Sequence, residues 1–287
     1  MPKAKIGVIG GTGLYEIEGL TDIEEVKPKT PFGEPSDSII VGTLDGTEIA
    51  FMPRHGRGHF VSPTEIPARA NIYALKSLGV ECIISVSAVG SLKESIHPLD
   101  LVIPDQLIDR TSNRASSFFS GGIVAHVGFA RPFCPYLSDI LYKAALEEGA
   151  KVHPEGTYII MEGPLFSTKA ESNLYRSWGA SIIGMTALPE AKLAREAEIC
   201  YATVGCVTDY DVWHETEEEV TVDIAISNLK LTSDISKRII KRSIEHIPYK
   251  RDCQCASALR NAILTDPALI PPKTKEDLAL LIRKYIQ

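Results

Sequence analysis

The chain has 287 residues, enough for one large α/β domain or two small ones. Its hydrophobic content of 44% and charged content of 23% are ordinary for a globular protein, and its formal net charge of −7 argues against nucleic acid as the main partner. No apolar run is long enough to span a membrane, and the first residues lack a signal-peptide pattern, so we expect a cytoplasmic protein.

Buried-strand patterns alternate with helical patterns along the chain. This alternation predicts a single-domain α/β fold with a mixed, mainly parallel β-sheet flanked by helices. The predicted strands cover residues 5–9, 38–43, 48–52, 82–88, 157–161, 181–185 and 200–207. The predicted helices cover residues 66–78, 136–148, 168–179, 188–199 and 217–245. We expect a main domain at 1–250, followed at 251–287 by a segment and a helical tail packed on the same domain or on a neighbouring subunit.

A glycine-rich turn follows the first predicted strand. Residues 10–13 read Gly-Gly-Thr-Gly. Glycine lets backbone N–H groups approach an anion, and the Thr12 hydroxyl adds a donor. The spacing fits neither the phosphate loop of ATPases nor the dinucleotide fingerprint. The segment is therefore either an anion site of another kind or an ordinary turn.

Two later strand ends also present groups that could bind an anion. In the segment Pro-Arg-His-Gly-Arg-Gly-His, Arg54 and His55 directly follow a predicted strand, and the arginine fork matches phosphate oxygens. Ser87 lies at the end of the next predicted strand. Ligands bind at the carboxyl ends of strands in open α/β sheets, so these groups and Thr12 are predicted to share one site. The alternative for the basic segment is a solvated loop.

A long loop and a strand-to-helix turn lie in the middle of the chain. Residues 105–134 are polar without clear periodicity, and a loop of this length is usually functional. Phe166 lies in the turn Glu-Gly-Pro-Leu-Phe-Ser-Thr, where it could stack on a flat ligand. Packing in the core is the alternative for this ring.

The last predicted strand ends in two carboxylates, Asp209 and Asp211. At a spacing of i, i+2 they point to the same side of an extended chain. A partly buried aspartate has a raised pKa and can donate a proton to a leaving group. The alternative is that these residues cap the following helix.

Six cysteines are present. Four lie in or beside apolar runs and are predicted to behave as small buried hydrophobes: Cys82, Cys134, Cys200 and Cys206. Cys253 and Cys255 form Cys-Gln-Cys in a polar stretch. No second cysteine or histidine pair lies near them in the sequence, so we predict no metal site. A strained local disulfide and longer-range pairing remain open.

Several motifs occur in a fixed order and identify a family. They are Gly10-Gly11-Thr12-Gly13, Pro53-Arg54-His55-Gly56, Asn71-Ile72-Tyr73-Ala74-Leu75-Lys76, Ser87-Ala88-Val89-Gly90-Ser91, Glu162-Gly163-Pro164, Met185-Thr186, Pro189-Glu190 and Thr208-Asp209-Tyr210-Asp211. Together they resemble the 5′-methylthioadenosine phosphorylases of the trimeric purine nucleoside phosphorylase superfamily, over about residues 4–245. The Cys-Gln-Cys segment resembles the Cys-x-Cys of some archaeal members, where it forms a disulfide.

The resemblance implies a pentosyltransferase that converts 5′-methylthioadenosine and phosphate to adenine and 5-methylthioribose 1-phosphate. It implies a purine nucleoside phosphorylase-like fold, a cytoplasmic homotrimer, and no cofactor or metal, with phosphate as co-substrate. By similarity, phosphate would be bound by Thr12, Arg54, His55, Ser87, Ala88 and Thr186. The nucleoside would be bound by Phe166, Ile183, Met185, Thr208, Asp209, Asp211, Val222, Ala225 and Ile226, with His126 from a neighbouring subunit.

The resemblance also assigns roles within the nucleoside site. Asp209 would protonate or hydrogen-bond N7 of adenine, and Asp211 would bind the 6-amino group. Phe166 would stack on the purine and Met185 would lie against the ribose. The apolar residues Val222, Ala225 and Ile226 would accept the alkylthio group.

Two positions depart from the family pattern. Ser87 stands where Thr is usual, which keeps a hydroxyl, and Leu165 stands where the family commonly has Arg after Glu-Gly-Pro.

Three other functions compete with this interpretation. The closest is a 6-oxopurine or broad-specificity purine nucleoside or methylthioinosine phosphorylase, but such enzymes typically have Asn where Asp209 stands. A non-catalytic nucleoside-binding protein should lack one or more of the phosphate ligands. A nicotinamide-dependent oxidoreductase is disfavoured by the glycine spacing after the first strand.

Overall fold

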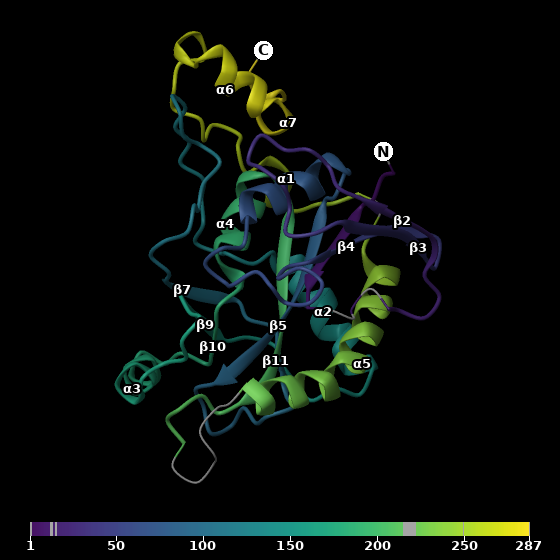
Figure 1. Ribbon diagram of the computed structural model, residues 1–287, viewed down its shortest axis with the longest axis vertical. Helices are drawn as coiled ribbons and strands as arrows, with labels where there is room; N and C mark the ends of the chain where they lie inside the picture. Colours follow the sequence, from purple (N-terminus) through teal and green to yellow (C-terminus); the bar gives the residue numbers. More distant parts are fainter. Residues whose placement is uncertain (1, 12–13, 15, 215–221, 249, 287) are drawn as a thin grey trace.

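A mixed eleven-stranded sheet forms the centre of the molecule (Figure 1). The computed structural model describes residues 2–11, 14, 16–214, 222–248 and 250–286. The sheet runs in the order β2-β3-β4-β1-β5-β10-β9-β7, with β11, β6 and β8 joined to it through β5. The predicted mixed, mainly parallel sheet flanked by helices is confirmed.

Strand β5 (Cys82–Ser91) is the hub of the sheet because it pairs with three others. Its first half is parallel to β1 (Ile6–Gly10), and its end is antiparallel to β10 (Ile182–Gly184). Along most of its length β5 is also parallel to β11 (Cys200–Asp209). Both β5 and β11 are buried along nearly their whole length, as expected for strands covered on both faces.

The remaining strands extend the sheet on either side. They are β2 (Thr21–Val26), β3 (Ile39–Leu44), β4 (Thr47–Pro53), β6 (Leu101–Val102), β7 (Gln106–Arg110), β8 (Val152–His153) and β9 (Thr157–Met161). The prediction of a structureless loop from residue 105 is wrong for β7, and β2 is absent from the prediction. Both are edge strands whose side chains are mostly exposed, so neither has the apolar pattern that marks a buried strand.

Helices cover both faces of the sheet (Figure 1). They are α1 (Ala68–Ser77), α2 (Pro135–Glu147), α3 (Lys169–Ser177), α4 (Ala187–Glu196), α5 (Val222–His246), α6 (Pro272–Asp277) and α7 (Ala279–Ile282). Two short 3₁₀ helices cover Gln254–Ser257 and Pro267–Leu269. Helices α1 and α4 share one hydrophobic cluster, and α2 and α5 share another. Within the described residues, no helix is both long and apolar enough to cross a membrane.

The C-terminal helices lie at one end of the molecule (Figure 1). Leu278, Leu281 and Ile282 are buried in the same cluster as α1 and α4. The Tyr73 hydroxyl of α1 donates to the backbone oxygen of Asp277 at 3.1 Å. The tail is therefore packed against the body of this chain.

Candidate active site

The carboxyl ends of parallel strands meet at one edge of the sheet. β1 is parallel to both β4 and β5, and β5 is parallel to β11. The segments that follow these strands are therefore brought together, as predicted for an open α/β sheet. The backbone N–H of Arg54 donates to Gly10 O at 3.0 Å, which joins the basic segment to the glycine-rich turn. Thr12, in that turn, lies outside the described residues.

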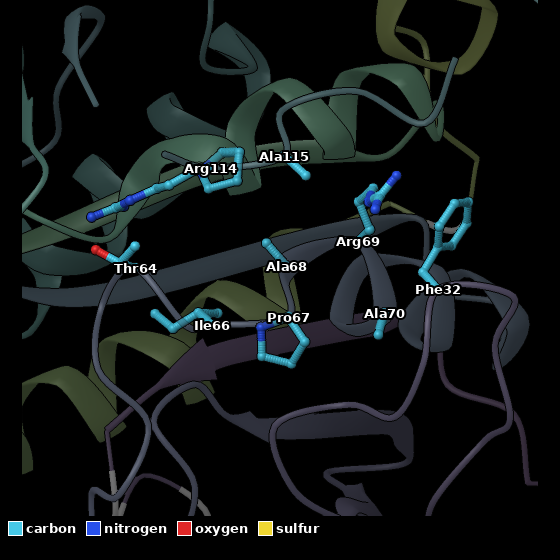
Figure 2. A pocket seen from close by; sticks show the side chains of 10 residues that line it. Phe32, Thr64, Ile66, Pro67, Ala68, Arg69, Ala70, Arg114 and Ala115 are labelled. Atoms are coloured by element: carbon cyan, nitrogen blue, oxygen red, sulfur yellow. The ribbon is translucent and has the colours of Figure 1, made fainter. Parts of the chain in front are cut away.

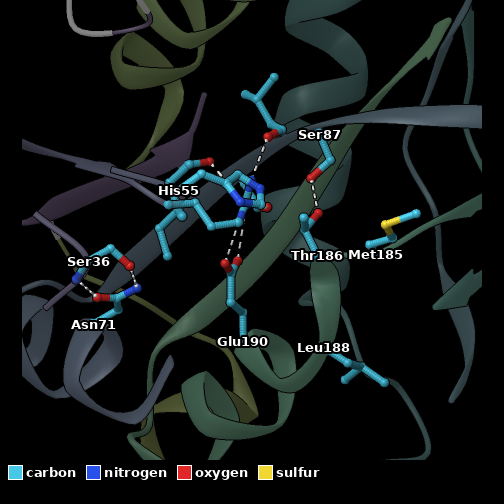
Figure 3. Close-up of polar contacts among 12 residues, drawn as sticks. Ser36, His55, Asn71, Ser87, Met185, Thr186, Leu188 and Glu190 are labelled. Atoms are coloured by element: carbon cyan, nitrogen blue, oxygen red, sulfur yellow. Dashed lines mark hydrogen bonds and ion pairs between the residues drawn. The ribbon is translucent and has the colours of Figure 1, made fainter. Parts of the chain in front are cut away.

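Arg54 is a buried arginine, with only 2% of its surface exposed. Its guanidinium forms a two-pronged ion pair with Glu190, Nε to Oε1 at 2.5 Å and Nη2 to Oε2 at 3.2 Å (Figure 3). Nη2 also donates to Ser85 Oγ at 2.7 Å, and Nη1 donates to Val86 O at 3.2 Å. Most of its donors are thus satisfied by the protein. Among the described residues, one N–H of Nη1 has no acceptor.

His55 lies next to this pair and is neutral at physiological pH. Its Nδ1 is 2.8 Å from Val61 O, so Nδ1 holds the proton and Nε2 presents a lone pair. Burial, assisted by the positive charge of Arg54, lowers the pKa of His55 to about 4. The ring stacks on His59 with centroids 4.2 Å apart. His55 therefore offers an acceptor, which suits the protonated oxygen of HPO₄²⁻, and not a positive charge.

Two hydroxyls, one from the middle of β5 and one from the segment between β10 and α4, meet beside these residues. Ser87 Oγ of β5 lies 2.8 Å from Thr186 Oγ1, just before α4 (Figure 3). Ala88, the next residue of β5, is partly exposed. The predicted hydroxyl donors from positions 87 and 186 are thus brought together by the fold.

Tyr158, on β9, is a buried residue at this site that the sequence did not reveal. Its hydroxyl is close enough to Thr186 and Ser87 to be influenced by both, yet it forms no hydrogen bond with any described residue. Burial raises its pKa to about 12, so the hydroxyl is a permanent donor. A buried hydroxyl without a partner costs about 1–3 kcal/mol. We therefore expect it to donate to a ligand held by Ser87 and Thr186.

Replacing Tyr158 with Phe tests this expectation. If the hydroxyl donates to bound phosphate, Tyr158→Phe should raise the KM for phosphate about tenfold, the loss of one hydrogen bond to a charged group. Its melting temperature should be unchanged or higher, because an unpartnered buried hydroxyl is removed. Tyr73→Phe, whose hydroxyl bonds Asp277 O, is the control and should leave the phosphate KM unchanged. An unaltered phosphate KM in Tyr158→Phe would exclude the contact.

Asp209, Asp211 and Ile183 converge on the end of β5. A Cβ atom at Gly90 would lie 2.9 Å from Asp209 Oδ1, 3.2 Å from Ile183 Cγ2 and 3.3 Å from Asp211 Cβ. Only glycine leaves room for these side chains so close to the backbone. The structure thus assembles a compact group of two carboxylates and an apolar side chain.

Burial raises the pKa of both carboxyl groups, which shifts each of them toward its protonated form. Asp209 Oδ1 accepts from the Asp211 N–H at 2.8 Å, and Asp209 Oδ2 accepts from Thr208 Oγ1 at 2.6 Å. Burial raises the pKa of Asp209 in spite of these bonds. Burial, and then the charge of Asp209, raises the pKa of Asp211, whose Oδ2 has no hydrogen bond among the described residues. The helix-cap alternative is wrong, because residues 211–213, directly after the strand, form a turn and not the first turn of a helix.

Arg114 fixes the backbone around Met185. Its Nη1 donates to Met185 O at 2.5 Å and to Leu188 O at 2.6 Å, and its Nη2 donates to Glu162 O at 2.5 Å. The side chain thereby joins the segments after β9 and β10. Arg114 belongs to the polar loop 105–134. Its position in that loop was the only feature of the sequence that indicated a role for this residue.

Arg114 also lines a cavity of about 130 Å³ (Figure 2). Phe32, Thr64, Ile66 and Arg69 are among the residues that line it. Ligand pockets for small molecules usually measure about 300–1,000 Å³, so we assign no ligand to this cavity.

Phe166 and Leu165 are exposed on the turn between β9 and α3. Phe166 is 42% exposed and Leu165 is 81% exposed. The alternative that Phe166 packs in the core is wrong, and the ring is free to stack on a ligand.

The three residues predicted to form an apolar pocket belong to the first turns of α5. Asn228 of this helix donates to Thr208 O at 2.6 Å, which places the first turns of α5 beside the end of β11. Ile226 is 47% exposed there. The side chains of Val222 and Ala225 lie outside the described residues.

His126 lies apart from this group. Its backbone N–H donates to Ala262 O at 2.9 Å, where the loop pairs with the C-terminal segment.

The chain resembles known proteins over its whole length. Residues 5–245 match the family model described as the phosphorylase superfamily. The S-methyl-5′-thioadenosine phosphorylase of Geobacter sulfurreducens is 58% identical over 282 residues, which are 98% of this chain and 99% of that protein. The protein of the same name from Thermosynechococcus vestitus is 56% identical over 290 residues, 99% of each chain.

Solved structures give the same result. A methylthioadenosine phosphorylase sourced from an antarctic soil metagenomic library superposes with a TM-score of 0.94 at 49% identity, covering 98% of this chain and 99% of that chain. The methylthioadenosine phosphorylase of Schistosoma mansoni in complex with adenine superposes with a TM-score of 0.81 at 31% identity, covering 98% of each.

Proposed function

The chain belongs to the phosphorylase superfamily, as its motifs predict, and we propose that it catalyses phosphorolysis of 5′-methylthioadenosine to adenine and 5-methylthioribose 1-phosphate. The enzyme is then a pentosyltransferase of purine and methionine salvage. The observation that most supports this reaction is the pair of adjoining sites at one sheet edge: hydroxyls and Arg54 on one side, and Asp209 with Asp211 on the other.

In the proposed reaction phosphate is the nucleophile at C1′ of the ribose. Ser87, Thr186 and the remaining Arg54 N–H bind the phosphate, with Thr12 from the glycine-rich turn, the Ala88 backbone and the acceptor Nε2 of His55. The C1′–N9 bond breaks through an oxocarbenium-like state, and the fixed phosphate stabilises this positive charge at close range. No metal or cofactor is required in this scheme.

The leaving adenine needs a proton, and Asp209 is the proposed donor. An adenine anion is a poor leaving group, so a proton delivered to N7 lowers the barrier to bond cleavage. Burial raises the pKa of Asp209 and so increases the fraction that can donate. Asp211 accepts from the 6-amino group, Thr208 and Ile183 line the base site, Phe166 stacks on the purine and Met185 lies against the ribose.

The 5′ end of the substrate is proposed to lie against Val222, Ala225 and Ile226.

His126 is proposed to reach this end from a neighbouring subunit of a cytoplasmic homotrimer. Light scattering should then give three times the mass of the chain. His126→Ala should lower kcat/KM for methylthioadenosine without dissociating the trimer.

A parallel assay of four nucleosides tests the function. Release of free base from methylthioadenosine, methylthioinosine, adenosine and inosine is followed with and without phosphate. We expect phosphate-dependent release that is strongest from methylthioadenosine. Preference for the two inosines would refute the assignment of Asp209 and Asp211 to adenine but leave the phosphate site intact. Absence of release from all four would refute the enzymatic function.

A further inference from the structure

Four cysteines that are distant in the sequence meet at one point in the fold. The Sγ atoms of Cys134, Cys200, Cys253 and Cys255 all lie within 4.8 Å of one another. Three of these residues are buried, and Cys253 is half-buried. The sequence predicted isolated buried cysteines and no metal site, because no second pair lay near Cys253. The second pair is distant along the chain, and the fold supplies it from Cys134, just before α2, and Cys200, at the start of β11.

The distances between the sulfur atoms suit a mononuclear metal centre. Cys200 Sγ and Cys253 Sγ are 3.2 Å apart, well beyond a disulfide bond of about 2.05 Å. In a tetrahedral zinc site with Zn–S bonds of about 2.3 Å, neighbouring sulfurs are roughly 3.8 Å apart. Four sulfurs within 4.8 Å of one another require only small movements to reach that geometry. Iron–sulfur clusters contain inorganic sulfide between the irons and hold their cysteines farther apart.

The surroundings of the cluster would stabilise thiolates. Arg251 Nη1 lies 3.7 Å from Cys200 Sγ, and this nitrogen is fixed by Glu81 O at 3.0 Å and Glu198 O at 2.9 Å. Cys134 directly precedes α2, a helix of 13 residues, whose N-terminal end favours negative charge. Hydrogen-bonded groups of this kind around a metal site orient its ligands and tune their charge.

We propose that Cys134, Cys200, Cys253 and Cys255 bind one Zn²⁺ ion as a structural site. Four thiols lose four protons to solvent and form four Zn–S bonds, and Arg251 partly balances the net negative charge of the centre. All four positions of the tetrahedron are filled by protein, which is the mark of a structural and not a catalytic zinc.

The place of the cluster in the fold indicates what the metal does. Cys200 and Asp209 stand at opposite ends of β11, roughly 30 Å apart at the usual rise per residue. The metal therefore has no direct part in the chemistry at Asp209. It joins the segment after α5 to the starts of α2 and β11, and so fixes the C-terminal segment to the sheet.

Metal analysis of the purified protein tests the proposal independently of its enzymatic activity. The full chain is purified under a phosphine reductant, exposed to equimolar Zn²⁺, desalted and analysed by mass spectrometry for metals. We expect about one zinc per chain. Cys253→Ser and Cys255→Ser should retain little zinc. Cys206→Ser is the matched control. Cys206 is a buried cysteine of β11, the strand that also contains Cys200, but it lies outside the cluster. This variant should therefore retain zinc like the wild type.

A second measurement covers the case in which the serine variants do not fold. Wild-type protein stripped of metal and loaded with Co²⁺ should show the strong ligand-field and charge-transfer absorption of tetrahedral cobalt with four thiolates. Removing the metal with a chelator should lower the melting temperature and leave the kcat of the folded enzyme unchanged. The proposal is overturned if the reduced wild type retains no zinc and gives no thiolate–cobalt spectrum. It is also overturned if the unreduced protein, as expressed, has these four cysteines in disulfides.

Discussion

Asp209→Asn should lower the turnover of 5′-methylthioadenosine by a factor of about 10²–10⁴, the usual loss when a general acid is removed. The amide oxygen can still accept from the Asp211 N–H, which Asp209 Oδ1 accepts at 2.8 Å in the wild type. An amide nitrogen can donate a hydrogen bond to N7 but cannot transfer its proton. The variant therefore keeps the shape of the base site and loses only the acid. Turnover numbers for both proteins at saturating phosphate give the answer.

The pH dependence of stability provides a control for the same variant. Burial raises the folded-state pKa of Asp209, so the folded protein binds this proton more tightly than the unfolded chain does. Below the ordinary aspartate pKa of about 4, the proton on Asp209 contributes fully to the free energy of unfolding of the wild type. That contribution is lost as pH rises through the raised pKa of the folded state. Asparagine does not titrate. The free energy of unfolding of Asp209→Asn, relative to wild type, should therefore increase with pH over this range.

Two results would contradict the assignment. Near-normal turnover in Asp209→Asn would show that adenine leaves without this acid. A relative stability that falls with rising pH would show that Asp209 is held in its charged form, and a charged carboxylate has no proton to give to N7.

The ends of the buried strands could be predicted from the sequence because each is marked locally. A run of apolar residues followed by glycine or hydroxyl residues defines β5, and the carboxylates after Val207 define the end of β11. The parallel arrangement then brings Ser87 and Asp209 to the same edge. Short-range signals of this kind were enough to predict an anion site and a pair of carboxylates, whereas the reaction itself followed from the resemblance of the ordered motifs to the phosphorylases.

Residues that act through distant partners could not be predicted in the same way. Glu190 is 136 positions from Arg54, and Arg114 is 71 positions from Met185. The unpartnered hydroxyl of Tyr158 and the four-cysteine cluster likewise depend on packing between separate elements. No local pattern distinguishes such a tyrosine or cysteine from an ordinary core residue. The edge strands β2 and β7 were missed for the opposite reason, since their side chains are too polar to form a buried-strand pattern.

The second large effect is expected at the buried pair of Arg54 and Glu190. The sequence alone predicts that Arg54→Ala mainly weakens the use of phosphate. The structure adds a loss of stability, because both side chains are 2% exposed and the variant would leave Glu190 as an unpaired buried charge. Breaking a buried ion pair in this way costs about 3–5 kcal/mol. Urea unfolding of Arg54→Met, which preserves more of the side-chain volume than alanine does, should show a loss of this size.

The double variant Arg54→Met/Glu190→Gln separates the structural role of Arg54 from its role in binding. Glutamine retains an oxygen that can accept from the Tyr201 hydroxyl, which lies 2.9 Å from Glu190 Oε2, and it removes the unpaired charge. Most of the lost stability should therefore return, since replacing both partners of a buried pair is often nearly neutral. If the remaining Arg54 N–H binds phosphate, the folded double variant should still need at least about tenfold more phosphate for half-maximal rate. A phosphate KM equal to that of the wild type would mean that Arg54 only positions Ser85 and Val86 on β5, and that the hydroxyls and backbone N–H groups of the neighbouring strand ends bind the anion without it.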